Sequence, residues 1–227
     1  MKQKFTILFD LDGTLVDTAP DLMLAHNHVM RKFGYPTKST EDIRNLVGKG
    51  AGALIGRSIW GQAKKEFSKV LDEKIKEEMV KEFVNFYGKN IVNESTLING
   101  VKEFLKWCKD QNISMAVCTN KQEHLSNDLL KKIGIYDFFE YVAGSNTFDY
   151  CKPDPRHLTS VIEILDGDIK KTIMIGDSET DANAAKAAEI PVILIENGYT
   201  EKNTTEIYHN HLIKDFIGIE KIISEYL

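Results

Sequence analysis

The sequence predicts an α/β protein in which a parallel sheet carries helices on both faces and an all-helical segment interrupts the chain after the first strand. Short apolar runs alternate with amphipathic stretches along most of the chain, which is typical of parallel strands joined by helical crossovers. Residues 5–9 form the first run, and they read as a strand buried on both faces. From residue 18 to about 90 only helical periodicity is seen. We therefore expect a core domain of residues 1–17 and 91–227, and a helical domain of residues 18–90.

The helical segment begins with a helix-start signal directly after the first strand region. Thr18 is a candidate N-cap, Pro20 suits the first turn, and Asp21 takes the place of the usual Glu of a capping box. Apolar residues then recur at spacings of three and four until Gly34, which is followed by Tyr-Pro, ends the helix. The first helix is therefore expected to end near Phe33.

Two further helical features follow in this segment. A polar start at residues 39–42 leads into a short apolar stretch and then a glycine-rich run at residues 48–52. Residues 64–87 are strongly amphipathic, because apolar residues recur every four positions. These are Phe67, Leu71, Ile75, Met79 and Phe83.

The remainder of the chain alternates regularly between strands and helices. Strands are expected at residues 114–119, 141–143, 172–175 and 192–195. Helices are expected at residues 101–108, 123–132, 156–165, 179–188 and 215–226. Residues 196–210 are polar and predict a loop with a short helical piece, followed by a weak apolar pair at Leu212-Ile213.

Composition narrows the class of protein. The 227 residues are 28% charged and 42% hydrophobic, with a net charge of −5, which is an ordinary globular balance and argues against a nucleic-acid-binding surface. No signal peptide and no membrane span are expected, because no apolar run approaches the necessary length. Cys108, Cys118 and Cys151 are scattered and odd in number, so neither a disulfide framework nor a zinc site is expected. We expect a cytoplasmic protein, with Cys118 a small buried hydrophobe.

Two carboxylates follow the first strand. Asp10 and Asp12 are spaced by one residue, so both can face one site beyond the carboxyl end of the strand, where open α/β sheets bind ligands. The two charges would repel unless a cation lay nearby or one group stayed protonated. Such a pair suits phosphoryl transfer, with one carboxylate as nucleophile and the other as proton donor and acceptor. The plain alternative is an acidic turn.

Three further polar signals also follow predicted strands. Thr119-Asn120 could hold phosphate oxygens near a helix start, or simply cap the helix. Lys152-Pro153 places a cation on a stiffened loop, where a lysine is usually just solvated. Asp177 and Asp181 would share one side of the next helix's first turn, which the helix dipole favours in any case. An oxygen-rich cluster of Asp10, Asp12 and Asp177 suits Mg²⁺.

Together these signals resemble a known set of motifs. Asp10-x-Asp12-x-Thr14, Thr119-Asn120, Lys152-Pro153 and Gly176-Asp177-x-x-x-Asp181 resemble, in order and spacing, the four motifs of the haloacid dehalogenase (HAD) superfamily. The resemblance spans essentially the whole chain. It implies a Rossmann-like core and a helical cap inserted after the first motif, which residues 18–90 match.

The resemblance also implies a role for each residue. Asp10 would be the nucleophile and Asp12 the general acid/base. Mg²⁺ would be held by the carboxylates of Asp10 and Asp177 and the main-chain carbonyl of Asp12. The supporting residues would be Thr119, Lys152 and Asn120 on the phosphoryl group, and Thr14 and Asp181 behind the metal ligands.

Within the superfamily the chain looks like the phosphoglycolate phosphatases. The similarity rests on residues 47–51, Thr119-Asn120-Lys121, residues 176–178 and Gly198-Tyr199. It implies a small phosphorylated metabolite such as 2-phosphoglycolate as partner, a monomer or homodimer, and substrate contacts from Arg44 and Lys49. The glycine-rich stretch could otherwise be a flexible connector.

Several alternatives remain open at this point. A β-phosphoglucomutase-type mutase keeps both aspartates, and the substrate could also be another small phosphorylated metabolite or pyrophosphate. Asp12 counts against a dehalogenase, which has no alkoxide to protonate, and Lys49 does not match the Schiff-base lysine of a phosphonatase. A receiver-type signalling domain would place its acidic residues differently, and a binding protein would not need every catalytic position filled.

Overall fold

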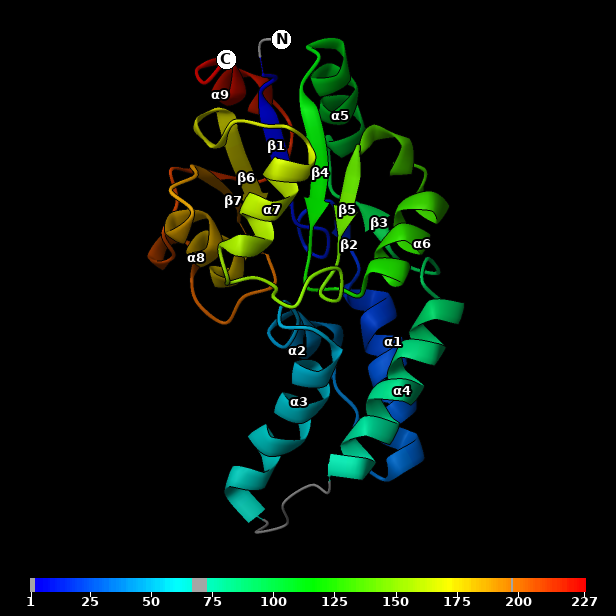
Figure 1. Cartoon of the computed structure of the whole chain (residues 1–227). Coiled ribbons are helices and arrows are strands. Elements are labelled where there is room, and N and C mark those ends of the chain that lie inside the picture. The colour runs from blue at the N-terminus through cyan, green and yellow to red at the C-terminus, as the bar shows by residue number, and fades with distance from the viewer. Residues whose placement is uncertain (1–2, 67–72, 197) are drawn as a thin grey trace.

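The computed structural model describes residues 3–66, 73–196 and 198–227, and its centre is a six-stranded parallel sheet (Figure 1). The strand order is β5-β4-β1-β6-β7-β8, with every neighbouring pair parallel. The strands are β1 (Thr6–Phe9), β4 (Ser114–Cys118), β5 (Tyr141–Ala143), β6 (Thr172–Gly176), β7 (Val192–Ile195) and β8 (His211–Ile213). In the central register, Phe9 of β1 lies opposite Val117 of β4 and Ile175 of β6. The expected strands are present, and the weak pair Leu212-Ile213 belongs to β8.

Helices cover both faces of this sheet, which explains the uninterrupted apolar strands. Side chains alternate across a strand, so Ile7 and Phe9 belong to one buried cluster and Leu8 to the other. The first cluster includes α5 (Val101–Asp110), α6 (Glu123–Ile133) and α9 (Ile219–Ser224), and the second includes α7 (Arg156–Ile164) and α8 (Glu179–Ala187). The predicted fold class, a Rossmann-like α/β core, is confirmed.

Helices α1–α4 lie beyond the carboxyl ends of the sheet strands (Figure 1). They are α1 (Ala19–Phe33), α2 (Thr40–Arg44), α3 (Ala51–Glu66) and α4 (Glu73–Lys89). We call them the α1–α4 segment. Helix α3 starts inside the glycine-rich run, and the amphipathic stretch expected from residue 64 corresponds to α4 from Glu73 onward. Phe67 and Leu71 of that prediction lie outside the described residues.

The predicted capping box at the start of α1 is wrong, because both side chains bind elsewhere. Thr18 is the N-cap residue but makes no capping bond, and its hydroxyl donates to Asp12 Oδ1 at 2.7 Å. Asp21 instead accepts backbone N–H bonds from Asn93 and Ser95 at 3.0 and 2.9 Å. Tertiary partners therefore replace the local bonds that the sequence pattern favours.

A short antiparallel ribbon joins the core to the α1–α4 segment. Strand β2 (Val16–Asp17) pairs with β3 (Thr96–Leu97) where the chain leaves the core and returns to it. Two-residue strands have no measurable periodicity, so the sequence gives no signal for them.

The C-terminal part differs from prediction only in the length of its last helix. Helix α9 begins at Ile219 rather than Asp215, because the Asp215 carboxylate accepts the N–H of Ile217 and holds a turn. The short helical piece in the 196–210 loop is a 3₁₀ turn at Thr204–Glu206, and two further 3₁₀ turns are Tyr136–Phe138 and Ile169–Lys171. Cys118 is fully buried, as expected, and no helix in the described part of the chain has the length and apolarity to cross a membrane.

Candidate active site

Two of the polar motifs, Asp10-x-Asp12 and Thr119-Asn120, line one cavity between the sheet and the α1–α4 segment. Its volume is about 250 Å³. The core side of the wall is mostly polar and includes Asp10, Asp12, Thr119, Asn120 and Lys121. The opposite side is mostly apolar and includes Leu22, Leu54, Val80, Phe83, Val84 and Tyr87. The carboxyl ends of β1 and β4 thus open into this cavity, as the sequence predicts.

Asp10 is the first residue after β1, and its carboxylate is buried against a lysine. Only 6% of Asp10 is exposed. Lys152 Nζ lies 2.9 Å from Asp10 Oδ1, yet this oxygen accepts no well-directed hydrogen bond from the described residues. Burial raises the pKa of Asp10 to about 6, with the Lys152 charge opposing the rise and Asp181 adding to it.

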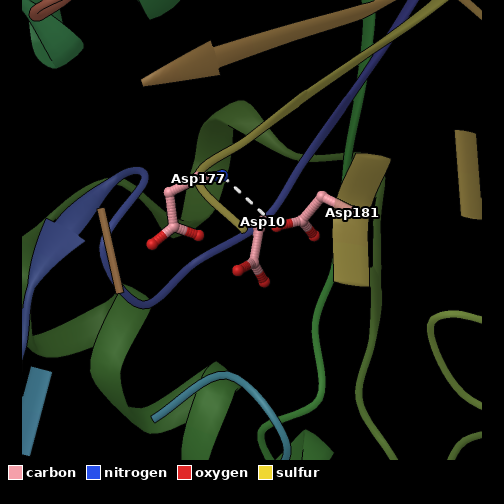
Figure 2. A group of neighbouring side chains, drawn as sticks. All are labelled: Asp10, Asp177 and Asp181. Carbon is pink, nitrogen blue, oxygen red and sulfur yellow. Dashed lines mark hydrogen bonds between the residues drawn. The ribbon is translucent and has the colours of Figure 1, made fainter. Parts of the chain in front are cut away.

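Asp177 and Asp181 complete an acidic group around Asp10 (Figure 2). Oxygens of the three carboxylates lie within 4.8 Å of one another, and all three residues are buried. Asp177 accepts the Tyr199 N–H at 2.5 Å and the Thr14 hydroxyl at 3.3 Å. Burial, followed by the charges of Asp10 and Asp181, raises the pKa of Asp177 well above its usual value.

Asp181 accepts four hydrogen bonds from its neighbours. One oxygen accepts the Lys152 ammonium at 2.5 Å. The other accepts the Ser178 hydroxyl at 2.7 Å and the N–H groups of Ser178 and Asp177 at 3.1 and 3.2 Å, and Figure 2 shows the last of these bonds. Asp181 therefore holds Lys152 and the start of α8 in place.

The backbone approaches Asp177 so closely that side chains are excluded there. Gly13 has φ +83°, and a Cβ atom at this position would overlap the Asp177 carboxylate and the Tyr199 ring. A glycine is therefore required both by conformation and by space.

These residues fit a divalent cation. Asp10, Asp177 and Asp181 place three carboxylates around the single ammonium of Lys152, which leaves an excess of buried negative charge. Asp181 already accepts four hydrogen bonds whereas Asp177 accepts two, so Asp10 and Asp177 are the carboxylates with more lone pairs to offer. Oxygen ligands of this kind suit Mg²⁺, which takes only a few carboxylates.

Asp12 lies on the same cavity but has its own cation. Lys121 Nζ donates to both Asp12 oxygens at 2.8 Å, and Thr18 donates to Oδ1 at 2.7 Å. The two motif aspartates thus face one site, as expected, with a separate lysine on each.

Thr119 and Asn120 follow β4 and are both buried. The Thr119 hydroxyl accepts the N–H of Lys121 at 3.2 Å. Asn120 Nδ2 donates to the carbonyls of Lys152 and Gly48 at 2.9 and 3.1 Å. Asn120 therefore joins the Lys152 loop to the glycine-rich loop of the α1–α4 segment.

The two candidate substrate residues of the α1–α4 segment lie in different places. Lys49 lines the cavity, with no ion-pair partner among the residues the structure describes. Arg44 is not brought to the cavity, because its guanidinium donates to Asp17 Oδ2 at 2.7 Å and lies 5.4 Å from the Tyr199 ring centroid. Substrate contact by Arg44 would require this ion pair to open.

Two residues of the site were given no role by sequence reasoning. Lys121 was visible only as the residue after Thr119-Asn120, and nothing local pairs it with Asp12, 109 positions away. Tyr199 donates its hydroxyl to Asp17 at 2.6 Å and its backbone N–H to Asp177. It links the ribbon to the acidic group, and only the Gly198-Tyr199 motif hinted at it.

Comparison with known proteins agrees with this geometry. A family model described as haloacid dehalogenase-like hydrolase matches residues 7–195. The chain belongs to this family.

Its relatives narrow the class further. It is 36% identical over 221 residues to a phosphoglycolate phosphatase of Mesorhizobium japonicum, with 97% of this chain and 95% of the relative covered. It is 37% identical over 216 residues to one of Caulobacter vibrioides, with 95% and 89% covered. The crystal structure of a predicted phosphoglycolate phosphatase from Haemophilus somnus 129PT superposes with a TM-score of 0.90 at 31% identity, covering 98% of this chain and 99% of that one. The chain is a phosphatase of the haloacid dehalogenase-like family.

Proposed function

We propose that this protein is a Mg²⁺-dependent phosphomonoester hydrolase that works through an aspartyl-phosphate on Asp10. The observation that carries the proposal is the Asp10 carboxylate, which is buried at the cavity with Lys152 at 2.9 Å and Asp177 beside it. A nucleophilic carboxylate must stay ionised, and the charge of a fixed lysine beside it favours the ionised form.

Each neighbour then has a defined task. Asp10 attacks phosphorus, the bond to the ester oxygen breaks, and Asp12 gives that oxygen a proton; Asp12 then takes a proton from the water that hydrolyses the aspartyl-phosphate. Mg²⁺, held by the Asp10 and Asp177 carboxylates and the Asp12 carbonyl, would supply charge stabilisation for the phosphoryl oxygens. Lys152 and Thr119 bind the phosphoryl group, while Thr14 and Asp181 orient their partners. The Asn120 amide would join them only after giving up its bond to the Gly48 carbonyl.

We further propose that residues 18–90 act as a cap domain on a core of residues 1–17 and 91–227. Support comes from the cavity, whose apolar wall is contributed largely by α1, α3 and α4. A cap over the site would exclude water from a reaction that depends on positioning and electrostatics. The free thiols of Cys108, Cys118 and Cys151 support the cytoplasmic location expected from the sequence, and a monomer or homodimer is part of the same proposal.

The proposed substrate is 2-phosphoglycolate, the substrate named by the relatives. In the wall given by the α1–α4 segment, Lys49 is a cation without an ion-pair partner among the described residues. The carboxylate of the substrate, at the end away from the phosphate, would be the ion-pair partner of Lys49. Arg44 would join it only after leaving Asp17.

The substrate proposal is tested by comparing two phosphate esters in one variant. Lys49→Ala should raise KM for 2-phosphoglycolate by about tenfold, the value of one charge-assisted contact, and leave KM for an aryl phosphate nearly unchanged. Lys81→Ala, on the exposed side of α4, is the matched control. Higher kcat/KM for sugar phosphates or pyrophosphate would refute the substrate but not the phosphatase activity. Activation by glucose 1,6-bisphosphate would instead indicate a mutase.

A further inference from the structure

Lys121 holds the Asp12 carboxylate at the cavity, and it does so from a buried position. Its side chain is 5% exposed and that of Asp12 is 11% exposed. The ammonium donates to both carboxylate oxygens at 2.8 Å. A buried ion pair of this kind costs desolvation and is a poor source of stability, so its presence beside a reacting group points to a task in the reaction.

The two oxygens of Asp12 are not equivalent. Oδ1 accepts from both Thr18 and Lys121, whereas Oδ2 accepts from Lys121 alone. A carboxylate oxygen has two lone-pair sites, so Oδ1 is saturated and Oδ2 has one site left. The pairing thus leaves one oxygen free to exchange a proton with a substrate.

Lys121 is in turn held by the α1–α4 segment. Its ammonium lies 4.5 Å from the centroid of the Tyr87 ring, within the range of a cation–π contact. Tyr87 belongs to α4 and is 1% exposed. Its hydroxyl has no hydrogen-bond partner among the described residues, so the ring face is the part that acts.

We propose that Lys121, held by its contact with the Tyr87 ring, is a positioning residue. It fixes the rotamer of Asp12 so that Oδ2 faces the leaving-group oxygen. This inference rests on the proposed phosphatase function. The position of Asp12 then also depends on α4, because Lys121 contacts the Tyr87 ring only while α4 lies over the site.

The competing role for Lys121 is direct binding of a substrate anion, since it lines the same cavity. The two roles differ in their kinetics. A binding residue acts on KM for every anionic ester, whereas a residue that positions the acid acts on kcat and mainly for poor leaving groups.

The experiment measures phosphoenzyme formation in single turnovers with an alkyl phosphate and with p-nitrophenyl phosphate. Lys121→Met should slow the alkyl ester by roughly 100-fold and the aryl ester by less than about threefold, with little change in KM. Lys121→Arg, which keeps a two-point contact with the carboxylate, should restore much of the alkyl rate. Tyr87→Leu should lower the ratio of the alkyl rate to the aryl rate by about three- to tenfold. Tyr87→Phe should keep this ratio near that of the unaltered protein.

Lys131→Met is the matched control, because Lys131 is exposed, lies 4.8 Å from the ring centroid of Tyr136 and does not line the cavity. Equal slowing of both esters, or an effect on KM alone, would overturn the proposal, as would equal behaviour of Tyr87→Phe and Tyr87→Leu. If Lys121→Met does not fold, the Lys121→Arg and Tyr87 variants decide by the same ratio. Lack of any phosphatase activity in the unaltered protein would refute the proposed function rather than this inference alone.

Discussion

Four aspartates share one site, and they differ in what holds their oxygens. Oδ1 of Asp10 lies near Lys152 but accepts no well-directed hydrogen bond from the described residues, whereas Asp181 accepts four hydrogen bonds, from Lys152 and from the start of α8. Asp12 is held by Lys121, and Asp177 by the Tyr199 backbone. These differences in free lone pairs suit the four aspartates to the different roles proposed for them: nucleophile, acid, metal ligand and support.

The proposed role of Asp177 as a metal ligand predicts a change in the dependence of activity on Mg²⁺. Asp177→Asn removes one of the two carboxylates proposed to bind Mg²⁺, so the Mg²⁺ concentration for half-maximal activity should rise at least tenfold. The rise in melting temperature that Mg²⁺ gives the unaltered protein should also shrink. Asp154→Asn, on the exposed loop before α7, should change neither quantity. Full activity in excess chelator would contradict the assignment.

The burial of His157 predicts that the protein loses stability at acid pH. It is fully buried on α7 with neither ring nitrogen hydrogen-bonded by a described residue, and burial lowers its pKa to about 4, helped by the Lys152 charge. Between its usual pKa, about 6.5, and that value, the unfolded chain binds more protons than the folded one, so stability falls as the pH falls. The contribution is about 3 kcal/mol at most.

Urea unfolding at pH 7.5 and pH 4.5 measures this effect. The difference in unfolding free energy between the two pH values should be smaller in His157→Leu than in the unaltered protein. His124→Gln, at an exposed position on α6, should not alter the difference. Identical pH dependence in the His157 variant would show that this histidine is not the cause.

At the scale of elements, the start of α1 and the returning chain are joined by one carboxylate. Asp21 is 1% exposed and accepts from the N–H groups of Asn93, Glu94 and Ser95, and from the Ser95 hydroxyl at 2.6 Å. With the β2-β3 ribbon, this bond set fixes both connections between the core and the α1–α4 segment.

Replacing Asp21 by Asn should therefore destabilise the protein. The amide has one acceptor oxygen and turns a donor toward backbone N–H groups, so a loss of about 3 kcal/mol is expected. Chemical denaturation would measure it. Asp42→Asn is the control, because Asp42 is an exposed member of the α2 capping box and should cost far less. Equal losses in the two variants would show that Asp21 acts only as a local cap.

At the scale of the whole molecule, the sheet and the site were largely predictable from sequence. Apolar runs such as residues 5–9 and 172–175 report burial on both faces, and that signal is local. The motif residues Asp10, Thr119, Lys152 and Asp177 were predictable because parallel strands end at one edge of a sheet. The structure brings all four together.

What sequence could not supply depends on contacts between distant residues. Thr18 and Asp21 fit a capping box, yet each binds a partner across the fold. Lys121 lies in the loop between β4 and α6, and Tyr87 lies on α4. No local sequence pattern indicates that these two residues are in contact. Arg44 reads as a free cation in sequence but neutralises Asp17. Such pairings are set by tertiary packing, and helix or strand propensity and hydrophobic periodicity carry no information about it.

The central claim is that Asp10 becomes phosphorylated during turnover. The most direct test is to quench the reaction with p-nitrophenyl phosphate in acid and to locate the phosphoryl group by peptide mass spectrometry. Asp12→Ala should help the intermediate accumulate, because its hydrolysis lacks a base. We expect the phosphoryl group on Asp10, and neither phosphoenzyme nor appreciable turnover in Asp10→Asn. Near-normal turnover by Asp10→Asn, or phosphate release without any phosphorylated Asp10 in the Asp12→Ala protein, would contradict the account.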